Sequence, residues 1–259
     1  MYEIFFISYG EIKSEDNWKK LKDKFPLARR IKDIKGIRNA HIAAANASWS
    51  SMFYVVDGDA EIVDDFLFDY IVPEEDFETV HVWSSVNPVN NLTYGYGGVK
   101  LLPKQLVINM DHSTPDMTTA ISKNFKIFDQ ISNITHFNTD PFNAWKSAFR
   151  ECVKLSSKVI DRHYEDETDY RLKIWCTVGE GKKLGNFVLE GANAGKKYGE
   201  ENAGDLIALS KINDFDWLKE QYGKDRTIKS LLDKIRNENT FHIIPELIDI
   251  QKILSENES

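Results

Sequence analysis

Two aspartates separated by one glycine are the residues of this sequence best placed to do chemistry. Asp57-Gly58-Asp59 directly follows an apolar run at residues 52–56. Such a run is typical of a buried strand, which ordinarily ends in small polar turn residues. Carboxylates at positions i and i+2 can both reach one hard divalent cation when the residue between them lets the backbone turn tightly, as glycine does. The motif therefore predicts a Mg²⁺ or Mn²⁺ site, although an ordinary aspartate-rich turn has the same sequence.

The elements before this motif must bring a ligand to it. Residues 3–9 are an apolar run that predicts a first parallel strand, and residues 25–31 predict a short second one. Ligands of open α/β sheets bind at the carboxyl ends of the strands. Ser8 and Tyr9 are therefore expected near a nucleotide, where Tyr9 either stacks on the base or closes the core.

Basic and acidic residues are unevenly distributed around the motif. From Lys19 to Arg38 there are nine Lys or Arg and two acids, whereas residues 57–78 contain ten acids and no Lys or Arg. Arg29 and Lys35 fall at or near predicted strand ends, where they could offset the charge of a diphosphate. The lysines of the helix predicted at residues 14–25 are expected to form a solvated face.

Composition restricts the classes of function. The chain has 259 residues, a formal net charge of −8 and two cysteines without zinc-type spacing. No apolar run approaches membrane-spanning length and no basic segment precedes an apolar one at the N-terminus, so a cytoplasmic protein without membrane association is expected. The negative charge argues against a whole-protein basic field for nucleic acid, but not against a local basic patch. Nothing in the sequence indicates an oligomeric state.

A segment rich in glycine and tyrosine occupies residues 87–100. It contains Tyr94, Tyr96, Gly97, Gly98 and Lys100. Closely spaced glycines fit a loop whose backbone approaches a ligand, and a β-turn with surface tyrosines is the alternative.

An alanine-rich helical pattern at residues 34–49 carries Arg38 and Asn39 and leads into the strand before Asp57. This order of elements resembles the donor half of family-2-type glycosyltransferases of the GT-A fold. The resemblance implies that Arg38 and Asn39 face a nucleotide-sugar, and that Asp57 and Asp59 hold its diphosphate through the metal. It also implies that the glycine- and tyrosine-rich segment lines the sugar and acceptor pocket.

The order of further motifs is similar to that of glycosyltransferases of tailed bacteriophages, over about residues 25–155. The motifs are Asn87-Pro88-Val89-Asn90, Tyr94-Gly95-Tyr96-Gly97-Gly98-Val99-Lys100, Asn138-Thr139-Asp140-Pro141-Phe142 and Trp145-Lys146-Ser147-Ala148-Phe149-Arg150-Glu151-Cys152. This resemblance implies transfer of a pentose such as arabinose, or of glucose, from a UDP-sugar to hydroxymethylated cytosine in double-stranded DNA. The net acidity conflicts with a DNA acceptor, so a polysaccharide or small-molecule acceptor is the alternative.

Two aspartates are candidates for the catalytic base of an inverting enzyme. Asp116 follows Pro115 at the start of a predicted helix, and Asp140 precedes Pro141 in an N-cap arrangement. The family resemblance implies a carboxylate after the Gly-Gly segment, at the start of a helix, which favours Asp116 by order along the chain. Either residue could be only a helix cap, and a retaining enzyme would need neither as a base.

The expected fold is α/β, a GT-A or Rossmann-like mixed, mostly parallel sheet flanked by helices, with a helical C-terminal lobe. We expect a nucleotide-sugar-binding and catalytic domain at residues 1–178, and an acceptor loop with the helical lobe at residues 179–259. Within these, residues 149–163 predict a helix, residues 170–178 a strand, and residues 179–204 a lysine-bearing loop that either faces the acceptor or only connects. Residues 215–235 and 245–255 predict amphipathic helices.

Overall fold

The computed structural model describes residues 1–95, 98–158 and 165–237. The chain divides into two compact units, Met1–Asn213 and Asp214–Ser259. The boundary expected after residue 178 lies inside the first unit. The glycine- and tyrosine-rich segment is described except for Tyr96 and Gly97.

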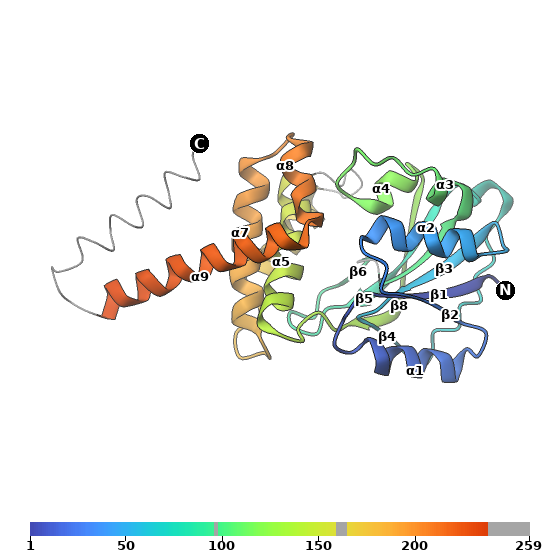
Figure 1. Cartoon of the computed structure of the whole chain (residues 1–259), viewed down its shortest axis with the longest axis horizontal. Helices are drawn as coiled ribbons and strands as arrows, with labels where there is room; N and C mark the ends of the chain where they lie inside the picture. The colour runs from blue at the N-terminus through green and yellow to red at the C-terminus, as the bar shows by residue number, and fades with distance from the viewer. Residues whose placement is uncertain (96–97, 159–164, 238–259) are drawn as a thin grey trace. The chain divides into compact units, whose positions relative to one another are not determined.

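A mixed β-sheet forms the centre of the first unit (Figure 1). Its strands, in spatial order, are β2 (Arg29–Lys32), β1 (Glu3–Ser8), β3 (Met52–Asp57), β7 (Val99–Pro103), β5 (Val80–Val86), β8 (Phe125–Thr135) and β4 (Ala60–Ile62), with β6 (Thr93–Tyr94) paired to β5. β1 is parallel to β2 and β3, and β5 is parallel to β8, whereas β7 is antiparallel to both its neighbours. The predicted α/β class and mixed sheet are confirmed.

The core of the sheet follows from the apolar run of β3, whose residues 52–56 are all buried. Successive side chains of a strand point to opposite faces. Tyr54 and Val56 therefore pack towards α1 (Ser14–Lys24), whereas Phe53 and Val55 pack towards α2 (Ile37–Ala47). Figure 1 shows α1 on one side of the sheet, and α2 with α3 (Lys104–Ile108) and α4 (Met117–Ile121) on the other. Helices therefore cover both faces of the sheet around β1 and β3, whereas much of β8 is exposed.

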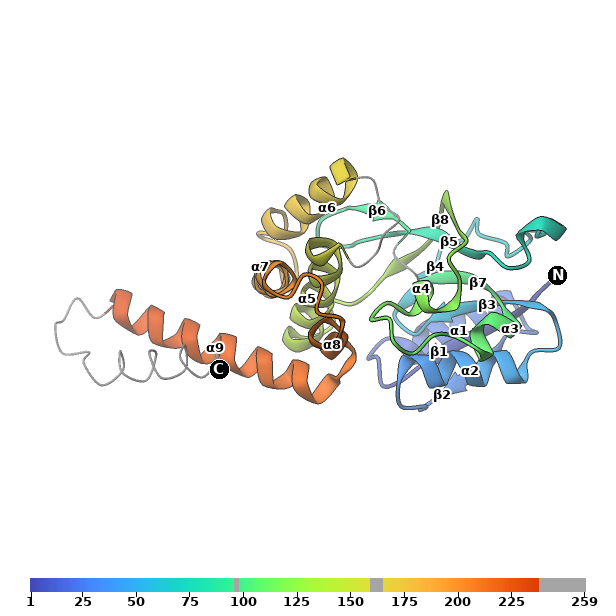
Figure 2. The same ribbon diagram turned by 90° about the horizontal axis from the view of Figure 1, so that it is seen from above.

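Two predictions for the middle of the chain are wrong. Residues 170–178 are not a strand but belong largely to helix α6 (Glu165–Thr177), and most of residues 179–204 is not a loop but helix α7 (Gly185–Glu201). α7 lies along α5 (Pro141–Ser157), as Figures 1 and 2 show.

Glycines explain the second error. Gly191, Gly195 and Gly199 recur every four residues, which places them on one face of a helix. A Cβ added at Gly191 would lie 2.2 Å from the carbonyl oxygen of Trp145, and one at Gly195 would lie 2.3 Å from that of Phe149. These glycines therefore let two helix backbones approach closely, and their abundance does not indicate a loop.

The remaining helices are short except for one. α8 (Leu206–Ser210) and two 3₁₀ turns (Glu74–Asp76 and Lys211–Asn213) belong to the first unit. The helix predicted at residues 215–235 is confirmed as α9 (Phe215–Asn237) in the second unit. The helix predicted at residues 245–255, and residues 159–163 of the one predicted at 149–163, lie outside the described residues. Within the described part of the chain, no helix has the length and apolar character needed to cross a membrane.

Candidate functional site

The Asp57-Gly58-Asp59 motif forms the turn between β3 and β4. Asp57 pairs with Ile7 of the parallel strand β1, so the motif lies at the carboxyl end of that pair, as predicted. Gly58 does not have a left-handed φ. A Cβ on Gly58 would instead lie 2.6 Å from Glu11 Oε2 and 3.0 Å from the carbonyl oxygen of Ile7. A larger residue at position 58 would therefore require the Glu11 side chain to move and would press against the β1 backbone, a contact that the sequence did not indicate.

Asp57 forms a close ion pair with Lys100. Lys100 Nζ donates to Asp57 Oδ1 at 2.9 Å and to Oδ2 at 2.8 Å. Lys100 is on β7, opposite Val55 of β3, and is only 4% exposed. The antiparallel pairing of these strands thus places an ammonium group where a cation on Asp57 would bind.

Asp59 has a different electrostatic environment. Burial, together with the negative charges of Asp57 and Glu11, raises the pKa of Asp59 to about 7, against the opposing influence of Lys100 and Lys146. The carboxyl is therefore partly protonated at neutral pH. Binding of a cation there would release a proton.

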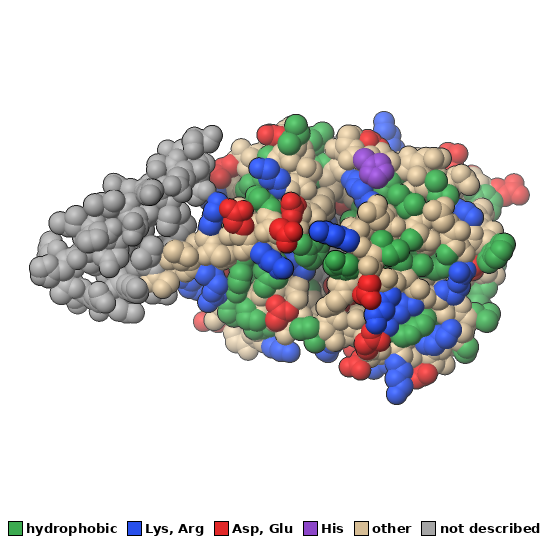
Figure 3. Space-filling view, in the orientation of Figure 1, with side chains coloured by type: hydrophobic (Ala, Val, Ile, Leu, Met, Phe, Trp, Pro, Cys, Tyr) green, Lys and Arg blue, Asp and Glu red, His purple; other side chains and the backbone are tan. Residues whose placement is uncertain are grey.

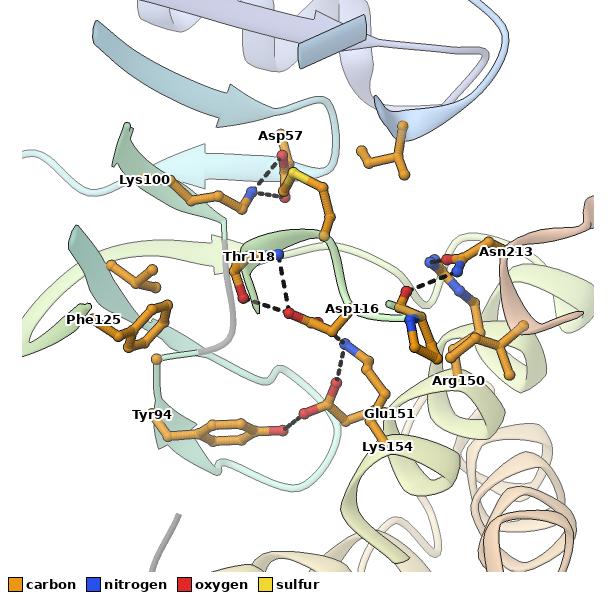
Figure 4. Close-up of a pocket in the computed structure, with 16 residues that line it drawn as sticks. Asp57, Tyr94, Lys100, Asp116, Thr118, Phe125, Arg150, Glu151, Lys154 and Asn213 are labelled. Carbon is orange, nitrogen blue, oxygen red and sulfur yellow. Dashed lines mark hydrogen bonds and ion pairs between the residues drawn. The ribbon is translucent and has the colours of Figure 1, made fainter. Parts of the chain in front are cut away.

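A cavity of about 210 Å³ opens beside Asp57 and Lys100 (Figure 4). Its walls come from the sheet on one side and from α4, α5 and the 3₁₀ turn Lys211–Asn213 on the other. The charged residues that line it are Asp57, Lys100, Asp116, Arg150, Glu151 and Lys154. Carboxylates and cations therefore alternate around a space that suits a small polar ligand.

Asp116, one candidate base, lies in this cavity as the N-cap of α4. It accepts hydrogen bonds from the backbone amides of Thr118 and Thr119, each at 3.0 Å, and from Thr118 Oγ1 at 2.5 Å. Lys154 Nζ lies 3.8 Å from Asp116 Oδ2. Burial tends to raise the pKa of Asp116, but Lys154 and these hydrogen bonds outweigh it and lower the pKa below its usual value. Asp116 is therefore an ionised carboxylate at neutral pH.

Sequence analysis did not identify Glu151, the third carboxylate that lines the cavity. Glu151 Oε1 accepts from Tyr94 Oη at 2.8 Å, and Trp175 Nε1 donates to the same Tyr94 oxygen at 3.0 Å. Lys154 Nζ lies 3.2 Å from Glu151 Oε2 and so links the Glu151 and Asp116 carboxylates. Tyr94 is 5% exposed, so the alternative of surface tyrosines does not hold for it. The sequence feature that could have identified this site is the presence of two charged residues, Glu151 and Lys154, among the apolar residues of α5.

Asp140, the other candidate base, does not line the cavity. It is the N-cap of α5 and accepts from the backbone amide of Asn143 at 2.9 Å. Burial tends to raise its pKa, but the hydrogen bonds from Asn143 and Thr139 outweigh that and lower it. Its contacts are those of a helix cap.

The predicted donor-binding residues on β1 and β2 are not gathered in the cavity. Ser8 is buried and accepts from Arg30 Nε at 3.0 Å, and Tyr9 is 49% exposed. Arg29 contacts Glu3 Oε1 at 3.3 Å and the carbonyl oxygen of Ala47 at 2.7 Å. Glu3 begins β1, so the guanidinium of Arg29 lies at the opposite end of the strand from Asp57.

The predicted residues near the start of α2 have local partners. Arg38 Nη1 donates to the carbonyl oxygen of Asp111 at 2.6 Å, and its Nη2 donates to that of Thr114. Asn39 Nδ2 donates to the carbonyl oxygen of Lys35 at 3.1 Å. Arg38 thus holds the segment that leads to Asp116, which is a different contact from the one expected with a nucleotide-sugar.

Gly98 is placed by close packing. A Cβ there would lie 2.4 Å from Asn133 Nδ2 on β8, and its carbonyl oxygen accepts from the amide of Asp57 at 3.0 Å. Tyr96 and Gly97 lie outside the described residues.

The two carboxylates at the turn, Asp57 and Asp59, could bind a divalent cation only if a substrate and water supplied the remaining oxygen ligands. Within the described residues there is no group of three or more His, Cys, Asp or Glu side chains that could hold a metal ion. Mg²⁺ is commonly held by one or two carboxylates together with substrate phosphates and water. Asp57 and Asp59 could supply that pair, provided that Lys100 shares or yields the Asp57 carboxylate.

Comparison with known proteins adds little about function. No protein-family model matches the chain, and no curated protein matches it. Among solved structures, the crystal structure of HddC from Yersinia pseudotuberculosis is similar at 15% sequence identity, over 51% of this chain and 90% of that one, with a TM-score of 0.29. A likeness at this level carries no argument about the activity of this chain.

Proposed function

We propose that this protein is a metal-dependent glycosyltransferase that moves a sugar from a nucleotide-sugar, with a UDP-sugar as the expected donor. One observation carries the proposal: a strand-terminal aspartate, Asp57, and an ionised carboxylate, Asp116, line the same cavity. Sugar transfer needs one group that holds the departing diphosphate and another that takes the proton of the attacking hydroxyl. The two walls of the cavity could supply these groups.

In this proposal, Asp57 and Asp59 hold Mn²⁺ or Mg²⁺, which when bound supplies positive charge for the leaving diphosphate. Lys100, which contacts Asp57, adds a fixed positive charge on the same wall. Asp116 accepts the proton of the acceptor hydroxyl as the new sugar–oxygen bond forms and the sugar–phosphate bond breaks. Thr118 and Thr119 keep this carboxylate oriented.

The acceptor is proposed to be hydroxymethylated cytosine in DNA, with arabinose or glucose as the sugar, because of the resemblance to bacteriophage enzymes. The second candidate is a glycosyltransferase acting on a polysaccharide or small molecule, which the formal net charge of −8 favours. On the face seen in Figure 3, the coloured Lys and Arg side chains are interspersed with Asp and Glu instead of forming one basic patch. That face therefore offers DNA no broad electrostatic attraction.

The test is to incubate the protein with Mn²⁺ and a panel of nucleotide-sugars, with and without hydroxymethylated DNA, and to measure nucleotide release and sugar incorporation. We expect acceptor-dependent release from one donor, abolished by Asp59→Asn and by removal of the metal. Release that requires an oligosaccharide instead of DNA would select the second candidate. No release from any donor, with the protein shown to be folded, would refute the glycosyltransferase assignment.

A further inference from the structure

Among the described residues, Arg150 is the cation of the cavity that forms no ion pair. The other two cations are paired, Lys100 with Asp57 and Lys154 with Glu151 and Asp116. Arg150 Nη2 donates to the neutral side chain of Asn213 at 3.1 Å. Its Nε is buried and has no hydrogen-bond partner among the described residues, where no carboxylate forms an ion pair with it either.

This arrangement is costly in the empty protein. Burial lowers the pKa of Arg150, since water no longer solvates the guanidinium fully. The group nevertheless keeps its charge, because the pKa of an arginine lies far above neutrality. An unpaired buried N–H adds a further penalty. A bound anion would offset the first cost by supplying a counter-charge.

The position of Arg150 indicates which part of a ligand would bring that anion. Arg150 is on α5 and is joined through Asn213 to Pro115, the residue before Asp116, because Asn213 Nδ2 donates to the Pro115 carbonyl oxygen at 2.9 Å. The attraction exerted on Arg150 by Glu151 and Asp116 exceeds that exerted by Asp57. In Figure 4, Arg150 lies on the side of Asp116 and Asn213, away from Lys100. It therefore belongs to the wall of the candidate base.

We propose that the acceptor of this enzyme is phosphorylated, and that Arg150 binds a phosphate oxygen of it, as in a phosphodiester, beside Asp116. This inference rests on the proposed function for the identity of the acceptor side. The planar guanidinium presents N–H groups in a fork that matches phosphate geometry. One recessed arginine would also let a protein with a formal charge of −8 take a polyanionic acceptor without a basic surface.

The test measures binding of three probes without metal, by calorimetry and thermal shift: inorganic phosphate, a dinucleoside monophosphate that carries one phosphodiester, and UDP. The variants are Arg150→Gln and Arg150→Lys. Arg226→Gln, which removes an exposed guanidinium on α9, is the control. We expect Arg150→Gln to weaken binding of the dinucleotide roughly 10- to 100-fold, as loss of a charged hydrogen bond implies, with partial recovery in Arg150→Lys and no change in the control.

The thermal shift without any anion separates binding from a structural role. Arg150→Gln removes a half-buried charge that has no ion pair within the described residues, although Glu151 and Asp116 attract it, so its Tm should stay close to that of the wild type if the arginine serves binding. A clear loss of Tm, with phosphate stabilising both proteins alike, would refute the proposal. Weakened binding of UDP alone would assign the anion to the donor and refute the acceptor assignment. If the dinucleotide depends on Arg150 but no sugar is ever transferred, the phosphate site stands and the proposed function fails.

Discussion

The two walls of the cavity differ in how their charged side chains are paired. On the sheet wall, Lys100 and Asp57 pair with each other across two adjacent strands. On the helix wall, Lys154 is shared by two carboxylates, Asp116 and Glu151, and no ion pair to Arg150 forms within the described part of the chain. The charged side chains that line each wall therefore balance in formal charge, but on the helix wall they have alternative pairings and Arg150 forms no ion pair within the described residues.

This difference in pairing determines how each wall responds to the loss of one charged side chain. When Asp57 is lost, Lys100 keeps no ion pair within the described residues, so its buried charge is left poorly solvated. A shared cation keeps one partner after the loss of the other. Substitutions on the sheet wall should therefore mainly lower the free energy of unfolding, whereas substitutions on the helix wall should mainly lower kcat.

The largest expected effect is on turnover, through Asp116. If Asp116 accepts the proton of the attacking hydroxyl, Asp116→Asn should lower kcat by roughly two to four powers of ten, with little change in donor affinity, because a general base acts in the transition state. Asp140→Asn is the matched control, since Asp140 is also an N-cap but does not line the cavity. Steady-state kinetics checks this, and the reverse pattern would exchange the two roles.

The next effect is on stability, through Asp57. Asp57→Asn should lower the free energy of unfolding by roughly 2 kcal/mol, less than for a fully buried pair because the Asp57 side chain is 30% exposed. Asp116→Asn should cost less, since Lys154 keeps Glu151. The double variant Asp57→Asn with Lys100→Met should recover most of the loss in denaturant unfolding. Equal losses for Asp57→Asn and Asp116→Asn would remove the contrast between the walls.

A smaller, pH-dependent effect is expected at Asp59. Its pKa is raised to about 7 in the folded protein, so folding favours the protonated form, and this residue makes the protein less stable as pH rises from about 4 to about 7. Asp59→Asn should therefore raise Tm by a few degrees at pH 8 and hardly at all at pH 4. Asp65→Asn, at an exposed aspartate of the same acidic segment (residues 57–78), should change Tm little at either pH. A Tm gain that is the same at both pH values would contradict the raised pKa.

The smallest effect concerns four lysines of residues 179–204, the segment that the sequence predicts to be a loop. Lys196 and Lys197 lie on α7 within 3.8 and 3.7 Å of Glu200 and Glu201, whereas Lys182 and Lys183 precede that helix. If DNA is the acceptor, Lys182→Ala with Lys183→Ala should raise the KM for DNA modestly and flatten its salt dependence. The same change at Lys196 and Lys197 should have less effect, because their charge is already partly balanced. Equal effects of both pairs would argue against this distinction.

Local patterns predicted the sheet wall well. The apolar run before Asp57 and the alanine-rich pattern of residues 34–49 became β3 and α2, with ends within a few residues of those expected. Hydrophobic periodicity acts over a few residues, so it can be recognised without knowing the fold. The candidate caps Asp116 and Asp140 were also correctly placed at helix starts, because capping depends on adjacent residues.

By itself, then, the sequence determined where the acidic turn lies and which strand carries it, because both depend on neighbours along the chain. Only the tertiary structure decided which of the two caps shares a cavity with Asp57, and that Glu151, Lys154 and Arg150 complete its wall. Those residues are far from Asp57 in sequence and reach the cavity because the α5 backbone packs against the glycines of α7. Such packing depends on shape across distant segments, which no local periodicity records.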